Sequence, residues 1–232
     1  MRALVIIPAY NEEGAIVETI NNLNQTCEDV DYIIINDCSK DKTLDICRKN
    51  GFNVINLPVN LGIGGAVQTG YKYAYENEYD IAIQMDADGQ HDPKYIPELI
   101  AKIKEGNDLV IGSRFLEKQG FQSTFIRRMG INLYSGIIKL FTKKEIKDTT
   151  SGYRAASKKV IKIFAKNYPV DYPEPETNAF IAKNNFNIVE IPMEMKQRDT
   201  GASSITPIKS IYYAVKVGLA VMLACIVKNR EV

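Results

Sequence analysis

The chain has 232 residues, of which 45% are hydrophobic and 25% charged, which is ordinary for a soluble globular protein and enough for one large domain. The net charge of +1 is unevenly spread, because residues 1–114 carry 10 basic against 18 acidic side chains and residues 115–170 carry 12 against 3. A basic segment beside an acidic one indicates an anionic partner, such as a phosphate or a membrane surface, unless it is only a solvated helical face.

The cysteines and the single histidine argue against a zinc site and against a disulfide framework. Cys27, Cys38, Cys47 and Cys225 form no C-x-x-C pair, and His91 is the only histidine. A zinc site of the usual kind cannot be assembled from this set, and no spacing suggests a disulfide framework. We therefore expect a protein of the reducing cytosol.

Apolar runs alternate with helical patterns through the first half of the chain. Each run is short and ends in polar residues, as expected of strands buried on both faces of a parallel sheet. The N-terminal run lacks the cleavage pattern of a signal peptide and is interpreted as the first strand. The predicted strands are 3–8, 31–37, 53–58, 81–85 and 109–112, and the predicted helices are 13–25, 43–49, 66–77 and 93–105. This alternation predicts an α/β fold with a mostly parallel sheet, helices on both faces, and strand ends that converge on one ligand.

The second half has a different pattern. Residues 125–142 predict a helix that mixes basic with apolar side chains. After it we expect a loop leading into a strand at 148–154, a helix at 158–166, a loop and helix at 168–184, and a strand at 187–195. The region that follows, up to residue 204, is polar and is expected to be mobile.

The C-terminal stretch, residues 205–227, is a candidate membrane element. Lys209 and Lys216 interrupt it, so its longest uncharged run, residues 217–227, is too short for the ~20 apolar residues that a membrane span requires. An amphipathic helix lying on a membrane surface fits the pattern. An ordinary helix packed on the domain fits it equally well.

The acidic turn after the predicted strand at 81–85 is the strongest chemical signal. Asp86 and Asp88 flank one residue, so both can reach a single cation from a turn. Carboxylate oxygens suit Mg²⁺ or Mn²⁺, which typically bridge to substrate phosphates. The pattern therefore predicts a metal–diphosphate site, although an isolated Asp-x-Asp is more often a surface turn. Asp92, before Pro93, is expected to cap the next helix, and His91 to lie at the start of that helix.

Several other classes of enzyme are excluded by motif. The Gly-rich stretch at 62–66 follows the third strand and lacks the last glycine of a dinucleotide fingerprint. No G-x-x-x-x-G-K-[ST] and no G-x-S-x-G occurs, and one histidine makes a Ser-His-Asp triad improbable. What remains is a set of polar strand ends suited to a nucleoside diphosphate and a metal.

At this point the chain resembles a known family. The order of its strand-end motifs is that of family 2 glycosyltransferases, in the branch of dolichyl-phosphate and undecaprenyl-phosphate sugar transferases. The motifs that carry the resemblance are Pro8-Ala9-Tyr10-Asn11-Glu12-Glu13, Asn36-Asp37-Cys38-Ser39, Asn60-Leu61-Gly62, Asp86-Ala87-Asp88-Gly89-Gln90, Gly112-Ser113-Arg114, Asp148-Thr149-Thr150-Ser151-Gly152-Tyr153-Arg154 and Tyr172-Pro173-Glu174-Pro175-Glu176. Each is weak alone, and together they cover residues 3 to about 200.

The resemblance implies a GT-A fold, inversion at the anomeric carbon and a divalent metal, Mg²⁺ or Mn²⁺. It places the nucleotide-sugar against Pro8, Tyr10, Glu12, Asp37, Gly62 and Asp86, the metal on Asp86, Asp88 and Gln90, and the acceptor phosphate on Arg114, Arg127 and Arg128. Among these, Asp88, Arg114 and Arg128 are also expected to act in catalysis. One departure from the family pattern concerns the residues that meet the nucleotide base: the usual Asp-Asp pair is Asn36-Asp37 here.

These features predict a metal-dependent inverting glycosyltransferase that moves a sugar from a UDP-, GDP- or dTDP-sugar to a polyprenyl phosphate. A lipid phosphate is anionic and attacks without a base, whereas a hydroxyl acceptor on a glycan or protein would need a carboxylate. For that alternative the candidates are Glu174 and Glu176, with Asp148 behind them. A non-catalytic partner that binds nucleotide-sugar and recruits a membrane subunit is the alternative from another class.

The expected organisation is a GT-A domain over residues 1–204, with a nucleotide-sugar-binding half at 1–114 and an acceptor-binding half at 115–204, followed by the amphipathic helix at 205–232. We expect a cytoplasmic protein associated peripherally with the inner membrane face, directly or through a separate membrane protein. No nucleic-acid partner is expected, and a homo-oligomer stays open.

Overall fold

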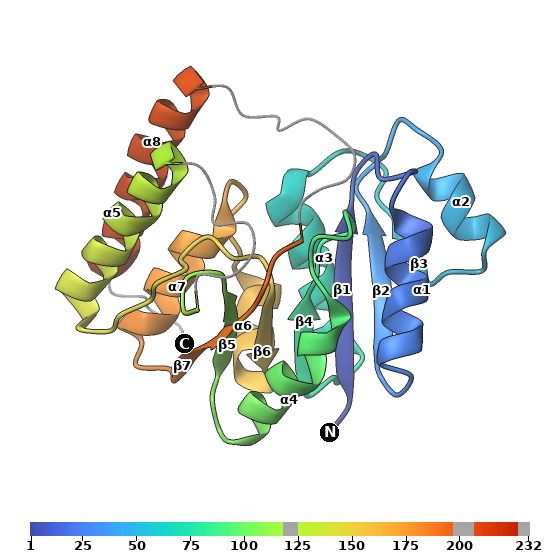
Figure 1. Ribbon diagram of the computed structural model, residues 1–232, viewed down its shortest axis with the longest axis horizontal. Coiled ribbons are helices and arrows are strands. Elements are labelled where there is room, and N and C mark those ends of the chain that lie inside the picture. Colours follow the sequence, from blue (N-terminus) through green and yellow to red (C-terminus); the bar gives the residue numbers. More distant parts are fainter. Residues whose placement is uncertain (118–124, 197–206, 227–232) are drawn as a thin grey trace.

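A seven-stranded mixed sheet organises the molecule (Figure 1). The computed structural model describes residues 1–117, 125–196 and 207–226, with only the helical backbone for 125–126 and 207–214. In spatial order the sheet runs β3-β2-β1-β4-β6-β5-β7. The strands are β1 (Ala3–Ala9), β2 (Asp31–Asn36), β3 (Val54–Asn56), β4 (Ile81–Gln84), β5 (Leu109–Ser113), β6 (Arg154–Ser157) and β7 (Ile188–Pro192).

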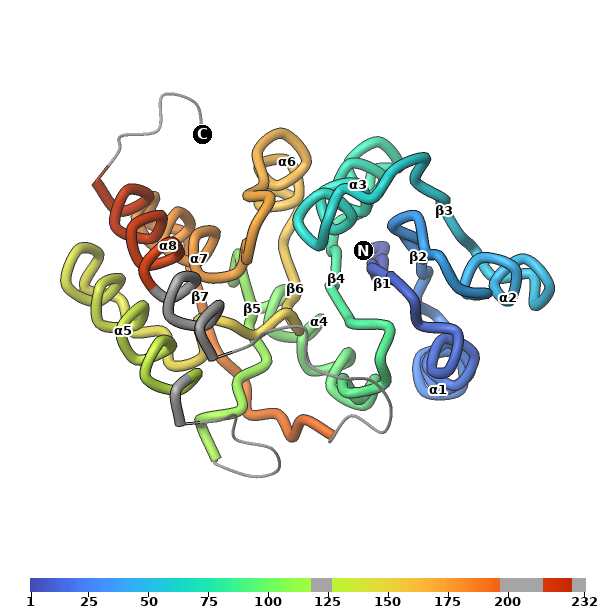
Figure 2. The backbone as a smooth tube through the Cα atoms, turned by 90° about the horizontal axis from the view of Figure 1, so that it is seen from above, coloured from blue at the N-terminus to red at the C-terminus, as the bar shows by residue number. Residues whose placement is uncertain are grey.

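The helices cover both faces of this sheet (Figure 2). They are α1 (Ile16–Thr26), α2 (Thr43–Lys49), α3 (Gly62–Glu76), the 3₁₀ turn η1 (Pro93–Tyr95), α4 (Ile96–Lys104), α5 (Phe125–Thr142), α6 (Lys158–Lys166), α7 (Pro173–Lys183) and α8 (Pro207–Ile226). Alternate residues of the buried strand β1 point to opposite faces, so Ile6 joins the core under α3 and α6, while Ile7 joins the core under α1 and α4. The prediction of a mostly parallel α/β sheet with helices on both faces is confirmed.

Strand β6 runs against its neighbours, and the sequence did not indicate this. It pairs antiparallel with β4, where Gln84 is opposite Arg154, and antiparallel with β5. All other pairs in the sheet, including β5 with β7, are parallel. The amino end of β6 therefore lies at the same edge of the sheet as the carboxyl ends of β1, β2, β4 and β5.

Several predicted boundaries were wrong by a few residues; for example, the helix predicted from residue 66 begins at Gly62, and the strand expected within 148–154 lies at Arg154–Ser157. The first helix begins at Ile16 rather than residue 13, because Glu12 to Ala15 form a turn in which the Glu12 carbonyl accepts from the amides of Ala15 and Ile16. The helix predicted from residue 93 opens as η1, with the carboxylate of Asp92 accepting from the Lys94 amide at 3.1 Å as expected for a cap. The third strand shrinks to three residues.

Helices α5 and α8 lie side by side at one end of the molecule (Figures 1 and 2). One face of α8 packs on α5 and α7 through Val217, Val221 and Cys225, which are buried. Its opposite face leaves Leu219 and Leu223 more than half exposed, at 53% and 55%. No helix of the described part of the chain is both long and apolar enough to cross a membrane. The predicted boundary between 204 and 205 and the residues after 226 lie outside the described residues.

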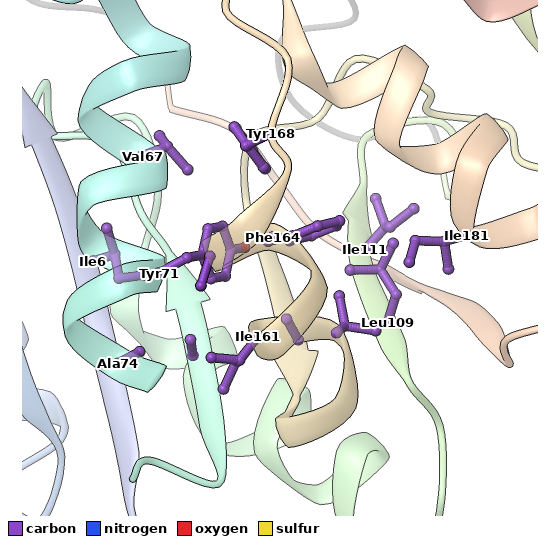
Figure 3. Close-up of a cluster of buried hydrophobic side chains, with 14 of the residues drawn as sticks. Ile6, Val67, Tyr71, Ala74, Leu109, Ile111, Ile161, Phe164, Tyr168 and Ile181 are labelled. Carbon is purple, nitrogen blue, oxygen red and sulfur yellow. The ribbon is translucent and has the colours of Figure 1, made fainter. Parts of the chain in front are cut away.

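The core beneath α3, α6 and α7 centres on three aromatic rings (Figure 3). Phe164 meets Tyr71 edge to face at 5.0 Å between centroids and Tyr168 at 5.2 Å. All three rings are buried. Such edge-to-face contacts add to the free energy gained by burying the rings.

We expect Phe164→Ala to lower the free energy of unfolding by about 3–5 kcal/mol, because removal of the buried ring would leave a cavity between α3 and α6. Urea denaturation followed by circular dichroism measures this loss. Leu140→Ala is the control: Leu140 is 78% exposed, so its removal should change stability by less than ~0.5 kcal/mol. Equal losses in the two variants would contradict the assignment of Phe164 to the core.

Candidate active site

The acidic turn lies at the carboxyl end of β4, where the chain reverses through Gly89. Gly89 has a φ of 76°, a conformation that favours glycine. The Gln90 amide donates to Oδ1 of Asp88 at 3.1 Å, and the Asp86 amide donates to Nδ1 of His91 at 3.0 Å. These bonds fix the turn so that Asp86 and Asp88 both remain partly exposed.

His91 supports this turn from beneath. Its ring is buried and stacks on Tyr153 with centroids 4.7 Å apart. Burial is the largest influence and lowers the pKa of His91 to about 4, while the Asp88 carboxylate acts in the opposite sense. The imidazole is therefore neutral at pH 7, and its Nδ1 is the acceptor for the Asp86 amide.

The acidic turn fits a divalent cation that is shared with a ligand. Among the described residues no three His, Cys, Asp or Glu side chains gather closely enough to hold a metal alone. Asp86 and Asp88 offer carboxylate oxygens, and such sites are completed by substrate phosphates and water. Nε2 of Gln90 donates to the backbone carbonyl of Lys196 at 3.1 Å. The backbone carbonyl of Gln90 accepts from the backbone amide of Lys196, also at 3.1 Å. Its Oε1 is the side-chain atom that could face a cation.

The ends of β1 and β2 form the edge predicted for the nucleoside. The Asp37 amide donates to the Ala9 carbonyl at 2.9 Å, which brings Asp37 beside the Pro8-to-Tyr10 stretch. Oδ1 of Asp37 accepts from the Leu61 amide at 2.7 Å, so this carboxylate also fixes the loop before α3. Gly62 begins that helix with a φ of 74°. Tyr10 is exposed, whereas Pro8 and Asp37 are buried.

Asn36, the departure from the family pattern, organises this edge. It is buried, donates from Nδ2 to Asn56 at 2.6 Å and accepts from the Ser39 hydroxyl at 2.6 Å. The Glu12 amide, close by, donates to the Thr43 hydroxyl at 2.8 Å. The amide side chain of Asn36 thus serves the internal structure of the loops, a role that the motif did not reveal.

Arg114 forms a buried ion pair with Asp148 at the end of β5. Its Nε and Nη2 donate to the two oxygens of Asp148, both at 2.7 Å, and Nη2 also donates to Thr150. Both side chains are almost completely buried. Asp148 is therefore the counter-charge of Arg114, and burial with this partner makes it unsuitable as a base for a hydroxyl.

The other two predicted arginines lie on the first turn of α5. The guanidinium carbon of Arg128 lies 3.5 Å from the centroid of the Phe115 ring, and that of Arg114 lies 5.1 Å from the same centroid. Partial desolvation and then the cation of Arg114 lower the pKa of Arg127, while Asp148 and Glu174 oppose them. All three predicted arginines are thus brought to one side of the sheet edge.

Glu174 and Glu176 stand in the first turn of α7. Nε2 of Gln84, the last residue of β4, donates to Oε1 of Glu174 at 3.4 Å. Burial raises the pKa of Glu176. The structure therefore places Glu174 next to the strand that carries the acidic turn, and Glu176 further into the helix.

A family model for glycosyl transferase family 2 matches residues 4–164. The chain belongs to this family. It is 36% identical over 211 residues to the UDP-N-acetylglucosamine–dolichyl-phosphate N-acetylglucosaminyltransferase of Methanococcus voltae, with 82% of this chain and 84% of the relative covered. It is 28% identical over 218 residues to the undecaprenyl-phosphate mannosyltransferase of Micrococcus luteus, with 89% and 88% covered. The resemblance stated from the motifs is confirmed, and the protein is a glycosyltransferase.

Solved structures agree on the fold. Glucosyl-3-phosphoglycerate synthase from Mycobacterium tuberculosis, crystallised with Mn²⁺, UDP and phosphoglyceric acid, superposes with a TM-score of 0.71 at 18% identity. The similarity covers 99% of this chain and 80% of that one. The GT-A-type fold expected from the motifs is thereby confirmed.

We expect Asp148→Asn to destabilise the protein by about 3–5 kcal/mol, because it leaves the buried Arg114 cation without its counter-charge. The measurement is the urea midpoint multiplied by the slope of the unfolding curve. Glu145→Gln is the matched control, since its ion pair with Lys139 is exposed on both sides and its loss should change stability little. If the two variants were equally stable, the buried pair would have no special importance.

Proposed function

We propose that the protein transfers one sugar from a nucleotide-sugar to a polyprenyl phosphate, with inversion at the anomeric carbon and with Mg²⁺ or Mn²⁺. The observation that carries this proposal is the joint placement of two carboxylates and a group of arginines at one sheet edge. The carboxylates suit a cation and a diphosphate, and the arginines suit a second phosphate. The names of the Methanococcus voltae and Micrococcus luteus relatives, which include dolichyl phosphate and undecaprenyl phosphate, support a lipid-phosphate acceptor.

In this proposal each group has a separate task. The edge formed by Pro8, Tyr10, Glu12 and Asp37 binds the nucleoside, and Gly62 lets the loop before α3 approach it closely. Asp86, Asp88 and Gln90 would hold the cation, which neutralises charge that develops on the departing diphosphate. At ~4 Å and an effective dielectric constant of ~20, one such opposite-charge pair contributes about 4 kcal/mol before desolvation costs.

The arginines bring the acceptor phosphate beside the donor diphosphate, which two anions would not do unaided. Arg127 and Arg128 contact the phosphate in this scheme. Arg114, which is paired with Asp148 and shares the Phe115 ring with Arg128, positions that ring and adds little net charge of its own. Because the phosphate oxygen is already anionic, it attacks the anomeric carbon without a general base.

The test is transfer of label from UDP-, GDP- and dTDP-sugars to polyprenyl phosphate in the presence of Mn²⁺. We expect label from one donor to enter the organic-extractable lipid, and Asp88→Asn to abolish this transfer. Asparagine keeps an oxygen that can accept from the Gln90 amide, so the turn should survive while the charge is lost. Calorimetry with the nucleoside diphosphate and Mn²⁺ then checks whether metal-dependent binding is lost as well.

Three results would count against this proposal. If label appeared only in water-soluble glycan, and disappeared in Glu174→Gln or Glu176→Gln, the acceptor would be a hydroxyl. Unchanged metal-dependent binding in Asp88→Asn would refute the metal assignment. Binding without any transfer would indicate a non-catalytic partner.

Membrane association is the second part of the proposal. Helices α5 and α8 carry apolar side chains that face solvent, namely Met129, Leu133 and Leu140 on α5 and Val215, Leu219, Leu223 and Ile226 on α8. The two sets adjoin, because a Cβ built on Gly218 would lie 3.9 Å from Leu133. We infer that this surface enters the headgroup region of the cytoplasmic leaflet, where the acceptor's lipid chain resides.

We expect the double variant Leu219→Glu/Leu223→Glu to lose most of its sedimentation with anionic liposomes, since two charges oppose burial of the helix face in lipid. Tyr75→Glu on α3 is the control, because it changes a side chain of similar exposure on another helix. Sedimentation of the double variant at the level of the wild type would show that α8 is merely structural. Transfer to a water-soluble short-chain phosphate should continue in either case.

A further inference from the structure

A second arginine, Arg154 on β6, is buried, and no carboxylate of the described residues is in contact with it. Its exposed fraction is 0%. Nη1 donates to the Thr177 hydroxyl at 2.8 Å and Nη2 donates to the Tyr168 hydroxyl, while Nε has no hydrogen-bond partner among the described residues. A buried guanidinium is costly unless a counter-charge compensates it.

The counter-charge is Glu174. Burial would lower the pKa of Arg154, but the oxygens of Tyr168, Tyr71 and Glu174 outweigh it, so the pKa lies above its usual value. Burial raises the pKa of the Tyr71 phenol to about 12 and that of Tyr168 well above its ordinary value, so both phenols are neutral at pH 7. Of these three groups, Glu174 is the carboxylate and is the one that can supply a compensating charge.

Hydrogen bonds connect Arg154 to Glu174 along two routes. On one route, the Thr177 hydroxyl that accepts from Arg154 donates to the carbonyls of Pro173 at 2.7 Å and Glu174 at 3.0 Å, in the first turn of α7. On the other, the Tyr168 hydroxyl donates to Oε1 of Gln84 at 3.4 Å, and Nε2 of Gln84 donates to Glu174. Arg154 therefore fixes both the backbone and the carboxylate of this glutamate.

Glu174 lies beside the acidic turn. A Cβ built on Gly152 would stand 3.1 Å from Nε2 of Gln84 and 3.5 Å from Oδ1 of Asp86, so that amide and that carboxylate flank the same point. The Glu174 carboxylate is bonded to the same amide. At this edge of the sheet β6 lies between the end of β4, which leads into the acidic turn, and the end of β5, which leads into Arg114, so Glu174 stands near the interval between the acidic turn and the arginines.

In the proposed reaction the donor diphosphate is bound at the acidic turn, and the anomeric carbon meets a phosphate at the arginines. The sugar must therefore occupy the interval between the acidic turn and the arginines. An anionic acceptor needs no base, so an ionised carboxylate here has a different task. Carboxylates accept hydrogen bonds strongly, and a sugar offers neighbouring hydroxyl donors. We propose that Glu174 binds hydroxyls of the transferred sugar and that Arg154 is the buried positioning residue that holds Glu174 in place. This inference rests on the proposed function.

The experiment compares a nucleotide-sugar with the same nucleotide lacking the sugar. Calorimetry with Mn²⁺ measures binding of UDP and UDP-N-acetylglucosamine, and of GDP and GDP-mannose, and the pair that the wild type binds is used for the variants. The readout is the affinity for the nucleotide-sugar divided by the affinity for the nucleoside diphosphate. We expect Glu174→Gln and Arg154→Met each to lower this ratio about tenfold, because hydrogen bonds to a charged, oriented acceptor are lost.

Three further variants separate positioning from general damage. Arg154→Lys keeps the charge, so the ratio of the affinity for nucleotide-sugar to that for nucleoside diphosphate should stay close to the wild-type value. Arg154→Met combined with Glu174→Gln should lower the ratio little more than Glu174→Gln alone, because both act through one carboxylate. Asp171→Asn removes a carboxylate from the loop before α7 that pairs with Lys216, and should leave the ratio unchanged.

Each contrary result has a distinct meaning. If Arg154→Met lowered the affinity for the nucleotide-sugar and for the nucleoside diphosphate equally, Arg154 would be merely structural and the inference would fail. If Glu174→Gln lost turnover but bound nucleotide-sugar as the wild type does, Glu174 would be a catalytic base and the inference would again fail. A wild type that bound none of the four ligands, and no dTDP-sugar either, would instead overturn the proposed function.

Discussion

The antiparallel pairing of β6 between β4 and β5 is the constraint on which the site depends. Because β6 runs opposite to both neighbours, its amino end meets their carboxyl ends. The residues just before it, Ser151 to Tyr153, therefore pass beside Asp86, and Tyr153 provides the surface on which His91 stacks. A parallel strand at this position would have carried the same residues to the far edge of the sheet. The reversed strand thus joins the acidic first half of the chain to its basic middle.

Two buried arginines then set the charge of the site in different ways. Arg114 is neutralised at contact distance by Asp148, so the pair stabilises the fold and adds little net charge. Within the described part of the chain, Arg154 is bonded to hydroxyls alone, and its charge is balanced at longer range by Glu174, which remains partly exposed. The first arrangement conceals a carboxylate from ligands, and the second presents one to them. The surface arginines of α5 complete a site that is anionic at one end and cationic at the other.

The sequence predicted those parts of the molecule that local patterns encode. The strands of the first half were recognisable because each is an apolar run with polar residues at its end, and the acidic turn followed directly from one of them. The helices on both faces followed from the alternation. The antiparallel β6 was missed because a four-residue strand after a loop gives no sign of its direction.

The side-chain partners within the site could not be predicted in the same way. Asp148 is 34 residues from Arg114, and Thr177 is 23 residues from Arg154. Such pairs depend on how the chain folds back on itself, and no periodicity records them. From the sequence, Asp148 is a further candidate for the base that a hydroxyl acceptor would need, whereas in the structure it is the buried counter-ion of Arg114. Asn36 looked like an altered nucleotide ligand, whereas its amide holds Asn56 and Ser39 in place.

If Glu174 binds the donor sugar as proposed, Gly152 limits how this enzyme could acquire a new donor sugar during evolution. Its backbone does not adopt the left-handed conformation, so the constraint is one of space alone. A methyl group there would lie 3.1 Å from Nε2 of Gln84, so this amide, which is bonded to Glu174, would have to shift by a few tenths of an ångström. In the proposed scheme, a substitution at Gly152 would therefore move the glutamate that binds the sugar. The first turn of α7 offers side chains that can change without this effect on the sheet.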